Sequence, residues 1–117
     1  MSDNGVALFG NTERVFIYED EGGDYLVRPA VVVVDGNHIR FRNFTPYVVE
    51  LNPGLFGAAA IGLAPRGTPG DQLTVALVNA QPGFNPYQVT VLDQGVERRR
   101  EAKLAKGNSR PGAIIDR

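Results

Sequence analysis

The sequence contains no cysteine, a single histidine (His38) and a single methionine (Met1). Without cysteine the chain can form neither a disulfide nor a thiolate metal site. One histidine cannot supply a two-imidazole metal site, and His38 has no nearby nucleophile with which to form a catalytic triad. No serine lies in the Gly-x-Ser-x-Gly setting of a hydrolase. We therefore predict no metal, no cofactor and no catalytic residue, and the sequence favours a protein that is not an enzyme.

Long apolar runs are also lacking, since the longest fall far below the roughly 20 residues that a membrane span needs. The N-terminus has neither the basic nor the apolar segment of a signal peptide, although a leader cleaved ahead of residue 1 stays open. The net charge is −1, so no overall field attracts nucleic acid or a membrane. We expect a cytoplasmic protein that binds neither.

Charge is nevertheless distributed unevenly along the chain. Acidic residues predominate in 1–30, with a dense group at 19–24, whereas basic residues predominate in 95–117. The acidic group lacks the ligand spacing of a calcium loop and is typical of a solvated hairpin tip. The two ends of the chain could attract each other, either within one chain or between copies.

Short strands and turns dominate what is present. The chain has 117 residues, 14 of them glycine and 8 proline, which suits one domain with many turns. We predict a single β-sandwich domain over 1–117, with 1–12 as an N-terminal arm. Alternating and β-branched segments predict strands, and 97–106 predicts a short helix or loop. The expected strands are 14–18, 25–28, 30–34, 38–44, 47–51, 73–78, 87–92 and 113–116.

Three segments resemble the cupredoxin-like family. Residues 35–43 (DGNHIRFRN) are similar to its Gly-Asp-x-Val-x-Phe-x-Asn strand, and 82–89 (PGFNPYQV) to its Pro-Gly-x-Tyr-x-Tyr turn. Residues 107–116 (GNSRPGAIID) are similar to the Ser-x-Pro-x-Ile-Ile-Val ending of some members. The resemblance implies an all-β, antiparallel Greek-key β-sandwich.

The copper function of that family does not carry over. A blue-copper site needs two imidazoles and a thiolate, usually with an axial thioether. Tyr47 occupies the position of the first histidine, and the thiolate is missing altogether. The resemblance therefore implies a copper-free relative.

Two surfaces are candidates for binding. Tyr47 and Tyr87 are expected near the end of the sandwich where relatives hold copper, and their hydroxyls with Arg40 or Arg42 could bind an anionic ligand. His38 alternates with these arginines and is expected to be an incidental solvent-facing residue. A second candidate is the apolar stretch of Leu55, Phe56, Ile61 and Leu63, which either caps the sandwich or forms a subunit interface.

The basic residues Arg98, Arg99 and Arg100 are candidates for the same interface or for a protein partner. No aromatic residues interleave with them, so stacking with nucleic-acid bases is unsupported. We predict a non-enzymatic structural or binding domain that self-associates as a homo-oligomer. The alternative is a small-ligand-binding or minor enzymatic domain that uses the tyrosines and arginines.

Overall fold

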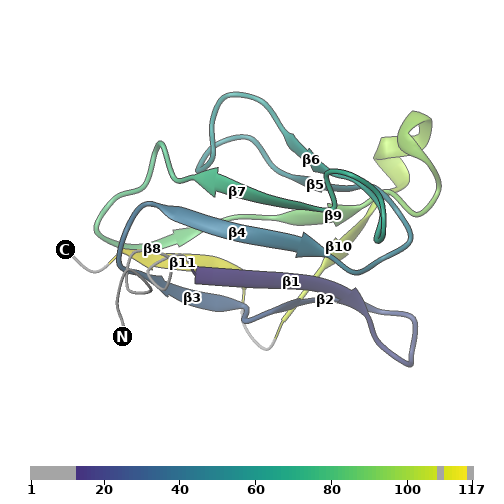
Figure 1. The fold of residues 1–117 in the computed structure, drawn as a ribbon, viewed down its shortest axis with the longest axis horizontal. Helices are drawn as coiled ribbons and strands as arrows, with labels where there is room; N and C mark the ends of the chain where they lie inside the picture. Colours follow the sequence, from purple (N-terminus) through teal and green to yellow (C-terminus); the bar gives the residue numbers. More distant parts are fainter. Residues whose placement is uncertain (1–12, 108–109, 116–117) are drawn as a thin grey trace.

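The computed structural model describes residues 13–107 and 110–115, and these residues form an all-β, sandwich-like fold (Figure 1). One 3-10 helix, η1, runs over Val96–Glu101. Within the described part of the chain, no helix is long and apolar enough to cross a membrane.

The first sheet has the strand order β2-β1-β4-β7. Its strands are β1 (Glu13–Glu19), β2 (Tyr25–Arg28), β4 (His38–Asn43) and β7 (Gln72–Ala76). Alternation decides which side chains point inward: Val15 and Ile17 of β1 are fully buried, as are Ile39 and Phe41 of β4. The side chains between them face outward, so this sheet has one buried and one open face.

Two further sheets lie on the other side of the core. One has the order β10-β9-β5-β6 and the other the order β3-β11-β8. The strands of the former are β5 (Val49–Leu51), β6 (Ile61–Leu63), β9 (Val89–Val91) and β10 (Lys103–Ala105). Those of the latter are β3 (Val31–Val34), β8 (Gly83–Pro86) and β11 (Gly112–Ile115).

These two sheets continue into each other. The chain passes from β8 directly to β9, and β11 and β10 pair antiparallel with β8 and β9 respectively. At the junction the amide of Tyr87 donates to the carbonyl of Pro111 (3.1 Å). Residue Lys106 also joins this layer to β2, because the amide of Val27 donates to its carbonyl (2.7 Å).

The core fills the space between the layers. Phe41 from the first sheet meets the ring of Tyr87 edge-on, with ring centroids 5.7 Å apart. Phe56 packs against both rings. The largest fully buried apolar side chains around this cluster are Ile17, Ile39, Leu51, Leu63, Val15, Val34, Val49, Val89 and Val91.

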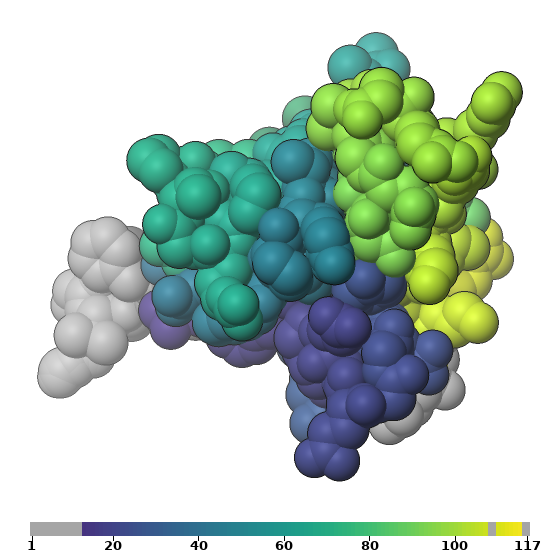
Figure 2. Space-filling model, turned by 90° about the vertical axis from the view of Figure 1, so that its right-hand side faces the viewer, coloured from purple at the N-terminus to yellow at the C-terminus, as the bar shows by residue number. Residues whose placement is uncertain are grey.

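One end of the molecule gathers several loops. Figure 2 looks onto this end, where the β1–β2 hairpin and the segment around η1 protrude on different sides. Asp20 builds the hairpin turn: its carboxylate accepts the amides of Gly22 and Asp24, each at 2.9 Å. This backbone role explains one member of the acidic group at 19–24.

The all-β prediction is confirmed, but the expectation of purely antiparallel sheets is wrong. Strand β1 pairs parallel with β4, and β3 pairs parallel with β11. A parallel pair needs a crossover connection, and here the chain runs through β2 and β3 before β4 returns beside β1. Sequence alternation reports which face is buried and contains no information on strand direction.

The sequence does not predict three of the short strands. Strand β6 lies in the apolar stretch of 55–63, β8 in the turn that the resemblance implies at 82–89, and β10 in the segment 97–106 predicted as a short helix or loop. Each is only three or four residues long, so periodicity has too few positions to reveal it. The expected helix exists only at the start of its segment, as η1. The proposed arm at 1–12 and the end of the last predicted strand at residue 116 lie outside the described residues.

Candidate functional site

The structure separates the two tyrosines that the sequence placed together. Tyr47 is half-buried and meets Tyr25 edge-on at 6.3 Å, at the end of the sandwich after β4. Tyr87 is only 2% exposed and packs against Phe41 and Phe56 in the middle of the core. Tyr87 therefore offers no hydroxyl to a ligand at that end.

The remaining members of the predicted ligand site lie on another face. Arg40 and Arg42 point outward from β4, and His38 is exposed at the start of the same strand. Phe41, which lies between the two arginines in sequence, points inward to Tyr87. The first sheet consequently lies between these basic side chains and Tyr87.

A different polar cluster occupies the end of the sandwich. The hydroxyl of Tyr25 donates to Oδ2 of Asp93 (3.1 Å), and Nζ of Lys103 lies 3.6 Å from the same oxygen. The Asp93 side chain is only 7% exposed, and its Oδ1 has no hydrogen-bond partner. Burial and the hydrogen bond to Asp93 both raise the pKa of Tyr25 far above its ordinary value. This cluster holds the β2 end of the first sheet against the loop after β9 and against β10.

The apolar stretch at 55–63 is part of the core. Leu55 is 8% exposed, Phe56 5% and Leu63 0%, while Ile61 is partly buried against the core. The amides of Gly54 and Gly57 donate to each other's carbonyls (2.7 and 3.2 Å), which folds the segment inward. Of the two alternatives, burial supports capping of the sandwich, because a buried side chain offers no surface to a subunit.

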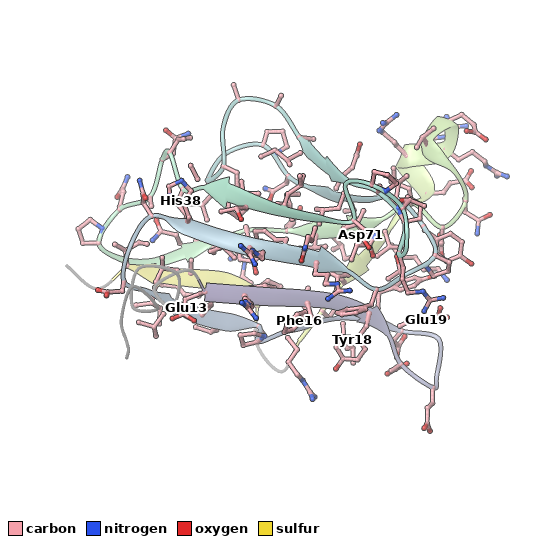
Figure 3. The ribbon with its side chains drawn as sticks, viewed as in Figure 1. Glu13, Phe16, Tyr18, Glu19, His38 and Asp71 are labelled. Carbon is pink, nitrogen blue, oxygen red and sulfur yellow. The ribbon has the colours of Figure 1, made fainter. Side chains whose placement is uncertain are left out.

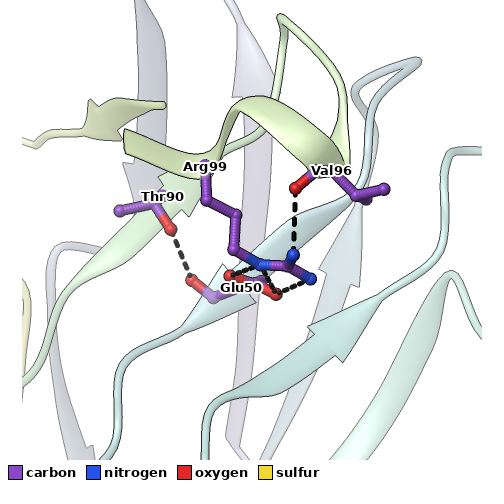
Figure 4. A network of polar contacts seen from close by, with 4 residues as sticks. All are labelled: Glu50, Thr90, Val96 and Arg99. Atoms are coloured by element: carbon purple, nitrogen blue, oxygen red, sulfur yellow. Dashed lines mark hydrogen bonds and ion pairs between the residues drawn. The ribbon is translucent and has the colours of Figure 1, made fainter. Parts of the chain in front are cut away.

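The basic residues of η1 are largely engaged within the chain. The guanidinium of Arg99 binds the carboxylate of Glu50, with Nη2 3.0 Å from Oε2, and also donates to the carbonyl of Val96 (Figure 4). Arg98 forms an ion pair with Glu101 at 2.7 Å. No such contact of Arg100 lies within the described residues. These pairings weaken the case for η1 as a basic docking segment.

An apolar surface lies instead on the outside of β3-β11-β8. Val33 is 54% exposed and Phe84 48% exposed, and both pair with the half-buried Ile114 of the central strand. The three side chains therefore form one row across three strands, which we call the Val33–Phe84 row. The Phe84 ring lies over Gly112, where an added Cβ would come within 2.3 Å of the ring.

A separate depression of about 380 Å³ is lined by residues 87–88, 104–107 and 110–111, next to the end of β8 and the start of β11. It contains Leu104, 48% exposed, together with Ala105 and Pro111 on its wall. The Val33–Phe84 row by itself is an apolar surface without a catalytic group. The sequence contains no signal for this row, because the exposure of Val33 and Phe84 and their position on either side of Ile114 follow from strand pairing.

Among the described residues, no group of three or more histidine, aspartate or glutamate side chains is placed to hold a metal ion. Comparison with protein-family models, with curated proteins and with solved structures finds no match to this chain. The proposals that follow are therefore argued from the chain's own residues.

Proposed function

We propose that the chain is a non-enzymatic, copper-free binding domain of cupredoxin-like Greek-key type that self-associates through the Val33–Phe84 row. The family part of this proposal is supported by the three motifs: 35–43 runs through the turn into β4, 82–89 spans β8 and the start of β9, and 107–116 contains β11. The described residues of each motif include a strand of the sandwich, as the resemblance implies.

Self-association is supported by one observation above all. Three apolar side chains stand in a row on the open face of a sheet, with two of them about half exposed. An apolar row on the open face of a sheet can be self-complementary, because a two-fold axis can lay the row of one copy against the row of another. Burying such side chains between copies removes apolar surface from water at roughly 25 cal/mol per Å². We infer that a symmetric dimer is the basic assembly.

Sedimentation velocity over a range of protein concentrations tests this proposal. We expect the unmodified chain to sediment as a dimer that dissociates on dilution. The double substitution Phe84→Ser and Val33→Ser should shift the equilibrium to monomer. Val78→Ser is the matched control, because Val78 is 62% exposed but lies after β7 in the first sheet. A strict monomer at the highest soluble concentration, or equal effects of control and double variant, would overturn the proposal.

A further inference from the structure

The open face of the first sheet carries arginine and aromatic side chains in alternation. Arg14, Phe16 and Tyr18 point outward from β1, and Arg40 and Arg42 point outward from β4. Arg28 at the end of β2 and Phe44 just after β4 extend the same surface. We call these seven residues the arginine–aromatic face; Figure 3 looks onto it, with Phe16 and Tyr18 labelled.

Parallel pairing of β1 with β4 brings the arginines together. Arg14 is the register partner of Arg40, and Phe16 is the register partner of Arg42. Partners on adjacent strands lie roughly 5 Å apart. The four side chains, together with Gln72 of β7, line a depression of about 250 Å³. Three guanidinium groups thus converge on one shallow concavity beside a phenyl ring.

The positive charge of this face is not neutralised within the described residues. The face contains four arginines, namely Arg14, Arg28, Arg40 and Arg42. None of them forms a salt bridge with a described residue, in contrast to Arg98 and Arg99 of η1. The acids of β1, Glu13 and Glu19, lie at its two ends rather than among the arginines (Figure 3). A chain with a net charge of −1 therefore has one strongly positive surface.

The aromatic rings are placed to stack as well as to pack. The rings of Phe16 and Phe44 lie 5.7 Å apart across the two strands. The guanidinium of Arg42 covers the Phe44 ring at 4.7 Å, and that of Arg28 lies 5.9 Å from the centre of the Tyr18 ring. A guanidinium that is held flat on a ring presents its own planar face, on which a nucleobase can stack.

We propose that the arginine–aromatic face binds single-stranded nucleic acid, without base-sequence preference. Arg14, Arg40 and Arg42 contact consecutive phosphates, while bases stack on Phe16 and on the Arg42–Phe44 pair. Single strands require a positive groove with rings that bases can reach, and this face combines the arginines with the half-exposed rings of Phe16 and Phe44. An acidic polypeptide supplies charge but no stacking bases, and the bases of a duplex are already stacked on each other.

The proposal differs from the sequence-based expectation that the protein does not bind nucleic acid. That expectation rested on the net charge of −1 and on residues 98–106, where no aromatic residue interleaves with the basic ones. On the first sheet the interleaving exists, but it joins residues about 26 positions apart in the sequence through the β1–β4 register. The inference does not depend on self-association, because the Val33–Phe84 row belongs to a different sheet.

Fluorescence anisotropy with labelled oligothymidylate and oligouridylate at low ionic strength tests the proposal. We expect saturable binding that weakens steeply with added salt. The double substitution Arg40→Gln and Arg42→Gln should weaken binding by about tenfold or more, and Phe16→Leu by about fivefold or more. Arg98→Gln with Arg100→Gln is the control of equal charge change and should alter the affinity by less than about twofold.

Thermal unfolding of each variant checks that it is folded. If Phe16→Leu does not fold, the variant with Arg40→Gln and Arg42→Gln still tests the proposal. Absence of binding at low salt would overturn the proposal. It would also be overturned if the control weakened binding as much as Arg40→Gln with Arg42→Gln. The proposal would also be contradicted if polyglutamate, duplex DNA or anionic lipid vesicles competed as well as an unlabelled single strand and Phe16→Leu left the affinity unchanged. The face would then be a general anion-binding surface.

Discussion

The side chains of Tyr25 and Tyr87 are both buried, but only the hydroxyl of Tyr25 has a hydrogen-bond partner. The hydroxyl of Tyr25 donates to Asp93, whereas the hydroxyl of Tyr87 is buried without a hydrogen-bond partner. Burial alone raises the pKa of Tyr87 far above its ordinary value, since no charged group contributes to the shift. An unpaired buried hydroxyl lowers stability, while a paired one is nearly neutral or favourable.

Replacing each tyrosine with phenylalanine should therefore have opposite effects. Tyr87→Phe removes an unsatisfied hydroxyl and should raise the free energy of unfolding by about 1 kcal/mol. Tyr25→Phe leaves the buried Asp93 carboxylate without its hydrogen bond and should lower it by about 1–3 kcal/mol. Urea denaturation of the two variants measures both changes. Equal changes of the same sign would contradict this account of the two hydroxyls.

Asn43 is a fully buried polar residue at the end of β4. Its Nδ2 donates to the carbonyls of Tyr47 (2.7 Å) and Ala64 (2.9 Å), and its Oδ1 accepts the amide (2.9 Å) and hydroxyl (2.7 Å) of Thr45. One side chain thus fixes the turn after β4 and ties it to the strand end at β6. Every hydrogen-bonding position of the amide is used, so a substitution leaves several buried groups unpaired.

We expect Asn43→Ala to lower the free energy of unfolding by about 2–4 kcal/mol, because the Ala64 carbonyl and the Thr45 amide lose their bonds to the Asn43 side chain. Chemical denaturation measures the change. Asn37→Ala is the matched control, since Asn37 is exposed in the β3–β4 turn, and should change stability by less than about 0.5 kcal/mol. A loss below about 1 kcal/mol for Asn43→Ala would mean that the network adds little to stability.

At the scale of elements, the 3-10 helix η1 depends on a contact with another element. It contains no buried residue, and Arg98 within it departs from helical geometry (φ −115°, ψ 42°). The ion pair between Arg99 and the half-buried Glu50 is the polar contact that fastens η1 to β5. Exposed ion pairs contribute little to global stability, but a local one can hold down a weakly packed segment.

Glu50→Gln should therefore loosen η1 while leaving the whole fold nearly as stable. We expect trypsin to cleave after residues 98–100 several-fold faster than in the unmodified chain, with a change in unfolding free energy below about 1 kcal/mol. Mass spectrometry of the products locates the cleavage. Glu97→Gln removes the same charge within η1 but not this ion pair, and the cleavage rate of that control should stay unchanged. Equal acceleration in both variants would argue against the role assigned to Glu50.

At the scale of the whole molecule, a net charge near zero conceals separated regions of charge. The acidic hairpin tip lies at one end, and the arginines lie on the open face of the first sheet. In η1, Arg98 pairs with Glu101 of the same helix and Arg99 with Glu50 of β5. The two proposed binding surfaces, the Val33–Phe84 row and the arginine–aromatic face, belong to different sheets. Their functions can therefore be removed one at a time.

Stability of the whole molecule should fall at alkaline pH. Tyrosine ionises ordinarily at pKa 10.0, whereas Tyr25 and Tyr87 keep their protons in the folded state above that pH. The unfolded state then binds fewer protons than the folded state, so the free energy of unfolding decreases as pH rises above about 10. Each tyrosine contributes at most about 1.4 kcal/mol per pH unit.

Urea denaturation from about pH 8 to about pH 11 measures this slope. Tyr87→Phe should make the decline shallower, because one of the two buried phenols no longer titrates on unfolding. Phe56→Leu perturbs the same aromatic cluster without removing a phenol, and its decline should remain as steep as that of the unmodified chain. A slope that Tyr87→Phe leaves unchanged would contradict the assignment.

The sequence by itself determined the all-β class, the outward face of β4 with His38, Arg40 and Arg42, and the exclusion of thiolate chemistry. These properties follow from side-chain type and period-2 alternation, which are local. Only the tertiary structure decided that β1 and β4 are parallel, that Tyr47 and Tyr87 lie apart, and that Leu55, Phe56 and Leu63 are buried. It also decided that Val33 and Phe84 flank Ile114 and that Arg14 lies beside Arg40. Each of these depends on pairing between distant strands, and alternation along one strand says nothing about which strand becomes its neighbour, or in which direction.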